Sequence, residues 1–132
     1  MKKMKRILSA AMVLLLMATL PVTAFAEEYN IDEGDIQVTA KSDGKQYVSQ
    51  PDNSIDHEEQ TSETIIKQTD GDTTATGNKI TITAEAEQTA EVTLSGVNID
   101  TSTKGGAAVS ATGGGDVNIE LDNENKIGRA HV

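Results

Sequence analysis

The stretch Lys79–Asp100, KITITAEAEQTAEVTLSGVNID, alternates apolar and polar residues with the period of a β-strand. The alternation changes phase at Ser95-Gly96 and then resumes. In a flat sheet such a shift would move apolar side chains onto the wrong face, whereas a corner between two sheets accommodates it. The apolar positions of the stretch are Ile80, Ile82, Ala84, Val92, Leu94, Val97 and Ile99. The stretch therefore predicts short strands joined by a corner.

Two further strand patterns follow this stretch, at Ala107–Thr112 and at Asp116–Ile127. The triplets Val92-Thr93-Leu94 and Val117-Asn118-Ile119 begin 25 residues apart, which is typical of one turn in a stacked repeat. No window after residue 26 has the period of a helix. We therefore expect an all-β fold, and an antiparallel β-sandwich fragment stays open as one arrangement of it.

The preceding segment is more polar. Alternation over Ile36–Ala40, the turn dipeptide Asp43-Gly44 and the pair Tyr47-Val48 predict a β-hairpin. The segment Thr64–Thr69 predicts one short strand, and Pro51–Glu63, which lacks an apolar face, predicts a loop.

The strand patterns have a known counterpart. The pieces ITIT, VTLSGVNID and AAVSATGGGDVNIELDNENKI together resemble bacterial secreted carbohydrate-binding-domain-containing proteins of the pectate-lyase-like type. The resemblance covers about residues 77–126 and implies a right-handed parallel β-helix that binds an extracellular polysaccharide, with calcium as a possible aid. The hairpin would then be an N-terminal cap on the first coils, and Asn98, Asn118, Asn123 and Asn125 would form amide ladders between coils.

The two ends of the chain differ from its middle. Residues 1–26 combine a basic start, a 14-residue apolar run and small residues at Ala24 and Ala26, the pattern of a signal peptide cleaved before Glu27. The last residues, 127–132, read IGRAHV, and the codons ATC GGA AGA GCA CAC GTC followed by TGA resemble a sequencing-library adapter. We therefore expect a signal peptide at 1–26, a polar segment with the hairpin cap at 27–76, the start of a β-helix repeat at 77–126 and adapter translation at 127–132. Such a fragment holds barely two coils, which predicts marginal stability.

Charge limits the partners. After residue 26 the chain has 7 basic and 21 acidic residues, a net charge of −14, which disfavours nucleic acid and anionic membranes. The chain has no cysteine, so disulfides do not stabilise its core. We expect a secreted or cell-surface protein that does not enter a membrane after cleavage, and the sequence leaves its oligomeric state open.

The sequence offers few groups for chemistry. His57 stands alone in a polar segment, and the one arginine after residue 26, Arg129, falls in the adapter-like tail. We therefore expect no catalysis and no evident cofactor. Calcium is the exception to consider, because carboxylates are its preferred ligands; the weak candidates Asp100, Asp116, Glu120 and Asp122 lie near predicted corners. Only Tyr29 and Tyr47 could stack on a sugar. The expected function is a non-catalytic polysaccharide-binding module, and the alternative is a structural cell-surface stalk or adhesin repeat whose function lies in a missing C-terminal part.

Overall fold

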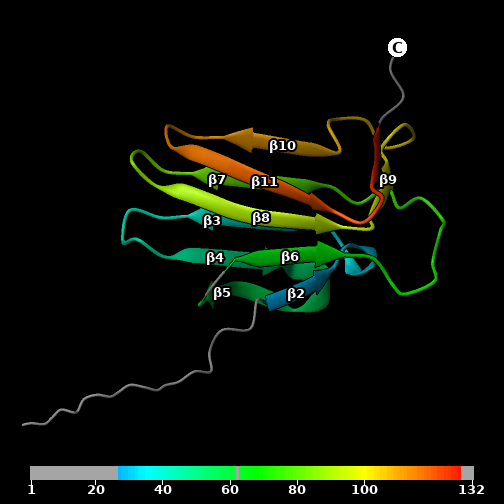
Figure 1. The fold of residues 1–132 in the computed structure, drawn as a ribbon, viewed down its shortest axis with the longest axis horizontal. Coiled ribbons are helices and arrows are strands. Elements are labelled where there is room, and N and C mark those ends of the chain that lie inside the picture. Colours follow the sequence, from blue (N-terminus) through cyan, green and yellow to red (C-terminus); the bar gives the residue numbers. More distant parts are fainter. Residues whose placement is uncertain (1–26, 62, 129–132) are drawn as a thin grey trace, which may run out of the picture.

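A computed structural model describes residues 27–61 and 63–128, and this part of the chain is built from short strands in three sheets (Figure 1). The strands are β2 (Glu27–Asn30), β3 (Ile36–Ala40), β4 (Gln46–Gln50), β5 (Ile55–Gln60), β6 (Thr64–Lys67), β7 (Ile80–Ala84), β8 (Thr89–Ser95), β9 (Asn98–Asp100), β10 (Val109–Thr112), β11 (Asp116–Asp122) and β12 (Lys126–Gly128). Two 3₁₀ turns, η2 (Ile31–Glu33) and η3 (Pro51–Asn53), complete the described elements. The all-β prediction is confirmed. Ala24 and Ala26 of the predicted cleavage site lie outside the described residues, and Glu27 is the first residue of β2.

The three sheets differ in strand direction. The parallel sheet has the order β11-β8-β6-β2, and all its neighbours run in the same direction. The short sheet pairs β12 with β9, again in parallel. The mixed sheet has the order β10-β7-β3-β4-β5; its first three strands are parallel, and β4 and β5 join antiparallel.

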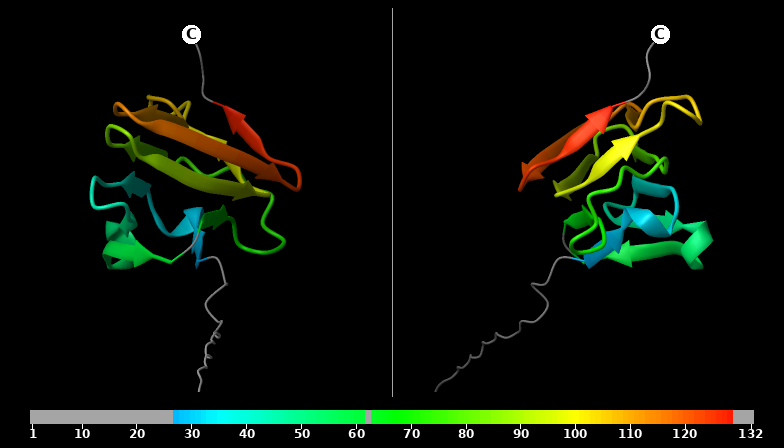
Figure 2. Two further views of the ribbon diagram at one scale, coloured as in Figure 1. Left: turned by 60° about the vertical axis from the view of Figure 1, so that its left-hand side comes forward. Right: turned by 90° about the vertical axis from the view of Figure 1, so that its right-hand side faces the viewer.

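The chain visits these sheets in a repeating order. After β8 in the parallel sheet it passes through β9 in the short sheet and β10 in the mixed sheet, and then returns to the parallel sheet as β11. We call one such passage a circuit. The preceding circuit runs from β6 past Thr76, which bridges Ile99 in parallel, to β7. Successive circuits therefore lie one above the other. In Figure 2 the red strand β12 lies beside the yellow strand β9.

The register of the circuits corrects one prediction. Val92 lies opposite Ile119, so paired residues of β8 and β11 are 27 positions apart, whereas the sequence pattern suggested 25. The 25-residue interval joins two similar triplets that are displaced from the true register by two residues. Such a displacement preserves which side chains face inward, because the side-chain period of a strand is two.

The phase shift at Ser95-Gly96 is the predicted corner. Gly96 has φ +68°, a left-handed conformation that favours glycine, and it joins β8 to β9, which belong to different sheets. Asn125 from the next circuit supports this corner, because its side-chain amide donates to the Leu94 carbonyl at 3.1 Å and its Oδ1 accepts from the Val97 amide at 2.8 Å.

The predicted asparagine ladders take a different form. Asn118 Nδ2 donates to Glu91 Oε2 at 3.0 Å, and Asn123 Nδ2 donates to the Ser95 hydroxyl at 2.8 Å. Asn98 Nδ2 donates to the Thr73 carbonyl at 2.8 Å. These amides do bridge neighbouring circuits. In the described hydrogen bonds these asparagines donate to a carboxylate, a hydroxyl or a backbone carbonyl, and none donates to another asparagine.

The polar segment before residue 77 contains more structure than predicted. The β3–β4 hairpin and the short strand β6 are confirmed. The prediction of a loop over Pro51–Glu63 is wrong, because Ile55–Gln60 forms β5 against β4. Tyr29 holds this strand in place: its hydroxyl donates to Glu58 Oε1 and accepts from Gln60 Nε2, each at 2.7 Å.

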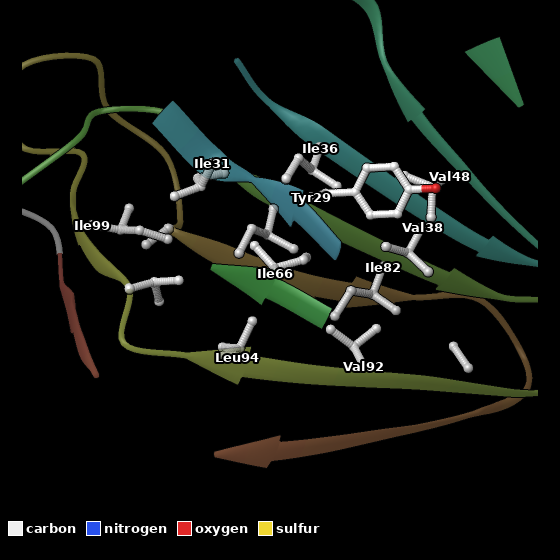
Figure 3. Packing of buried hydrophobic residues seen from close by; sticks show 14 of the residues in the cluster. Tyr29, Ile31, Ile36, Val38, Val48, Ile66, Ile82, Val92, Leu94 and Ile99 are labelled. Carbon is white, nitrogen blue, oxygen red and sulfur yellow. The ribbon is translucent and has the colours of Figure 1, made fainter. Parts of the chain in front are cut away.

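One hydrophobic core serves the whole described chain. Side chains from β2, β3, β4, β6, β7 and β8 meet between the mixed and parallel sheets (Figure 3). The buried apolar residues are Tyr29, Ile31, Ile36, Val38, Ala40, Val48, Ile66, Ile80, Ile82, Ala84, Ala90, Val92, Leu94, Val97, Ile99 and Ala108. Because these residues come from both sides of residue 77, the two predicted segments share one core.

Candidate functional site

The four predicted calcium ligands are spread along the last circuits. Asp116 and Asp122 occupy opposite ends of β11, and six residues of extended strand separate them by about 20 Å. Glu120 lies on the same strand, and Asp100 ends β9 in another sheet. Asp100 Oδ1 instead accepts the Ser102 amide at 2.9 Å, and this bond lowers the pKa of the Asp100 carboxyl. In residues 27–61 and 63–128 no three His, Cys, Asp or Glu side chains come together as a metal site.

Within the described residues, the contacts of His57 are with its neighbours in the β4–β5 hairpin, Asp56 and Ser49. It is exposed on β5 with φ +50°, and its Nδ1 contacts the Asp56 carboxylate at 2.5 Å. The neighbouring strand β4 accommodates this backbone conformation, since the Ser49 hydroxyl accepts the His57 amide at 2.9 Å. These contacts are local to the hairpin.

An uncharged surface lies instead on the outer face of the mixed sheet. The inward residues of β3, β7 and β10 include Val38, Ile82 and Val109, so the alternate residues point outward. These outward residues form two rows across the three parallel strands. One row is Thr39, Thr83 and Thr112, and the other is Gln37, Thr81 and Ser110.

Register places the members of each row directly beside one another. Parallel strands are about 4.8 Å apart, and alternate residues of one strand are about 6.7 Å apart, so the two rows form a regular grid. The hydroxyls of Thr83 and Thr112 lie 3.2 Å from each other, within hydrogen-bond distance. All six side chains are at least partly exposed, and none is charged. They can therefore offer several hydrogen-bond donors and acceptors to one flat ligand.

Tyr47 extends the first row by one strand. It lies opposite Thr39 in the antiparallel β3–β4 pair, so both side chains lie on the same face of the sheet. The Tyr47 hydroxyl donates to Asp43 Oδ2 at 2.7 Å, and this bond is the main cause that raises the pKa of Tyr47 to about 12. Lys41 Nζ lies 5.4 Å from the centre of the ring and covers one of its faces. We call Gln37, Thr39, Tyr47, Thr81, Thr83, Ser110 and Thr112 the hydroxyl face.

The hydroxyl face was not predicted from the sequence. Its members lie in three separate parts of the chain, and their register depends on the pairing of β3, β7 and β10. The available signal was the repeated pattern of two polar residues around one apolar residue, as in Thr81-Ile82-Thr83 and Ser110-Ala111-Thr112. The prediction used the apolar residue of each triplet and left its polar neighbours without a role.

A separate groove is lined by several acidic side chains. It has a volume of about 460 Å³ beside β2 and is lined by residues that include Glu27, Glu28, Glu33 and Glu58. Lys67 Nζ lies 2.8 Å from Glu28 Oε1 and offsets part of this charge. The groove and the hydroxyl face therefore present different chemistry to a ligand.

Comparison with known proteins finds no matching protein family, curated protein or solved structure. Within the described residues no helix is both long and apolar enough to span a membrane.

Proposed function

We propose that the chain is a secreted, non-catalytic module that binds a neutral polysaccharide through the hydroxyl face. The observation that carries the proposal is the grid of uncharged side chains on β3, β7 and β10. Sugars present many hydroxyl groups, which pair with Thr, Ser and Gln side chains as both donors and acceptors. Tyr47, at the end of one row, is half-buried, and the part of its ring that Lys41 leaves exposed adds an aromatic surface of the kind that contacts sugar C–H groups.

The charge distribution favours a neutral ligand over an anionic one. The hydroxyl face carries no charge, whereas the outer face of β11 carries Asp116, Glu120 and Asp122. An anionic polysaccharide would need cations to bridge it to those carboxylates, and the four calcium candidates are dispersed over two strands. The proposed binding therefore needs no calcium.

The fold proposed for this module is the start of a right-handed parallel β-helix, with β4 and β5 as its N-terminal cap. In support, the circuits stack through parallel pairs in all three sheets, and β4 covers the edge of β3 that faces away from β7. Capping of this kind protects a strand edge from pairing with another chain.

Retention on insoluble neutral polysaccharides, such as cellulose and chitin, tests the proposal. The double variant Thr83→Val, Thr112→Val removes two hydroxyls and keeps the branched shape of both side chains. Since each hydrogen bond contributes about 1 kcal/mol, the double variant is expected to weaken binding about tenfold or more. The matched control is Thr89→Val, which removes an exposed hydroxyl from the parallel sheet.

We expect a calcium chelator to leave retention unchanged. Retention on anionic pectate alone, lost with the chelator, would contradict the neutral-ligand proposal. If the double variant and Thr89→Val weaken retention equally, the binding site does not lie on the hydroxyl face.

A structural stalk is the second candidate function. It is favoured by the regular offset of the later circuits, in which paired residues lie 27 to 29 positions apart. Such regular stacking suits an extended spacer. A stalk predicts no retention on any polysaccharide.

A further inference from the structure

The hydroxyl face is a strip that is long across the strands and short along them. Its first row crosses β10, β7, β3 and β4, which lie one below another in Figure 1. Three strand spacings of about 4.8 Å give this row a length of about 14 Å. Along β3, β7 or β10 the face has only two outward positions, about 6.7 Å apart. A long ligand therefore fits along the rows better than along the strands.

Charged residues border the strip at both ends of its strands. Asp35 directly precedes β3 and Lys79 directly precedes β7, and Asp35 Oδ1 accepts the Lys79 amide at 2.8 Å. At the other ends, Lys41 follows β3 and Glu85 follows β7. Glu85 Oε1 accepts the Ser42 amide at 2.6 Å. A neutral chain laid along the strands would meet these charged groups and remove water from them, which costs free energy.

Charge also ends the first row beyond β4. Tyr47 lies opposite Glu59 of β5, so Glu59 is the next residue on the same face. The Glu59 carboxylate lies 3.2 Å from Lys45 Nζ. The first row therefore offers one uncharged side chain on each of four neighbouring strands. These side chains are Tyr47, Thr39, Thr83 and Thr112.

We propose that the hydroxyl face holds one extended, β-1,4-linked neutral glycan chain along its rows, with one sugar residue above each strand. This inference rests on the proposed binding of polysaccharide by the face. Equatorial bonds link the sugars of such a chain into a flat ribbon, and each sugar advances the chain by close to one strand spacing. The ribbon therefore stays in register with the side chains of successive strands, whereas an α-1,4-linked chain curls away from a straight row.

The two rows suit the two edges of the ribbon. Hydroxyl groups project from both edges of a β-1,4-linked chain, because successive sugars are turned over. Thr83 and Thr112 belong to the first row, and Thr81 and Ser110 lie on the same two strands in the second row. Since each hydroxyl can both donate and accept, β7 and β10 can each bind a sugar from two sides.

Isothermal titration calorimetry with soluble oligosaccharides of two to six sugars tests the inference. The probes are cello-oligosaccharides and chito-oligosaccharides, which are β-1,4-linked, and malto-oligosaccharides, which are α-1,4-linked. We expect the affinity for the β-1,4-linked series to rise up to four sugars and then to level off, because the row crosses four strands. We expect the malto-oligosaccharides not to bind.

Two single variants test the direction of the chain. Thr112→Val removes the hydroxyl at one end of the first row, so the fourth sugar is expected to add no further affinity. Thr83→Val removes a hydroxyl inside the row and is expected to weaken binding about fivefold for three sugars or more. The matched control, Thr89→Val in the parallel sheet, is expected to bind every length as the unchanged protein does. Circular dichroism establishes that the variants are folded.

Three outcomes would overturn the inference and leave polysaccharide binding by the hydroxyl face in place. They are an affinity that levels off at two sugars, tighter binding of malto-oligosaccharides, and retention on insoluble cellulose or chitin without binding of any soluble oligosaccharide. The last outcome would mean that the face needs an array of chains. Absence of retention on every polysaccharide would overturn both this inference and the proposed function.

Discussion

Single residues in the turn between β10 and β11 bring two circuits into close contact. A Cβ atom added at Gly115 would lie 2.3 Å from the carbonyl oxygens of both Glu85 and Gln88, whereas one added at Gly114 would lie 3.7 Å from the nearest atoms of Ala86. The Gly115 amide also donates to the Ala84 carbonyl at 2.9 Å. The backbone of one circuit therefore rests directly on that of its neighbour at Gly115.

Gly115→Ala is expected to lower the free energy of unfolding by about 2 kcal/mol or more, because backbone carbonyls rather than flexible side chains must move. Gly114→Ala, one residue away in the same turn, is expected to change it by less than about 0.5 kcal/mol. Urea unfolding of both variants measures the difference. Equal midpoints for the two variants would contradict the close approach.

At the scale of elements, the β3–β4 hairpin depends on a contact across its turn. The hydrogen bond from the Tyr47 hydroxyl, followed by that from the Lys45 amide, lowers the pKa of Asp43. A carboxyl with a lowered folded-state pKa stabilises the fold above its unfolded pKa. This contribution is lost as the pH falls through the folded-state pKa.

The variant Tyr47→Phe is expected to raise the pKa of Asp43 toward its ordinary value, because the largest cause of the depression is removed. An NMR titration of the side-chain carboxyl carbons measures the change. Asp100 serves as an internal control, since its lowered pKa comes from Ser102 in another circuit. An unchanged Asp43 midpoint would mean that the contact does not form in solution.

The elements also show what sequence could predict. Strands β7, β8 and β11 followed from alternation, since one face of each is apolar. Strand β5 has no apolar face; backbone pairing with β4 and the bonds of Tyr29 hold it. The sequence pattern cannot display such stabilisation, because it comes from residues distant in the chain. The hydroxyl face escaped prediction for the same reason, as its rows exist only once the register is known.

At the scale of the whole molecule, the shared core predicts that the described chain unfolds as one unit. Leu94 is 1% exposed and packs in the same cluster as Tyr29 and Val48, which come from the polar segment before residue 77. The strand pattern after residue 77 predicts barely two coils and marginal stability. The count was low because β2, β3 and β6, which belong to the stack, lie in that polar segment.

Leu94→Ala is therefore expected to destabilise both halves together, by about 3 kcal/mol, through loss of buried contacts. Tyrosine fluorescence reports on the half that contains Tyr29 and Tyr47, and circular dichroism reports on all strands. The two thermal transitions should coincide and shift by the same amount. A matched control is Leu121→Ala, at the exposed position that pairs with Leu94. We expect this variant to change the free energy of unfolding little. Separate transitions for the two probes would show independent units.

The order of pairing along the chain has a consequence for folding during synthesis. Strand β3 first meets a parallel neighbour at β7, with Ile36 opposite Ile80, so the hairpin can form well before the stack begins. Strands β8, β10, β11 and β12 each pair with a strand that has already been made, 27 to 29 residues earlier, and β9 is bridged through Ile99 to Thr76. Growth from the ribosome would thus add each later circuit to strands already made, whereas β2 and β3 wait for β6 and β7, which follow 37 and 44 residues later. The later circuits of the molecule can therefore form one after another, in the order in which they are translated.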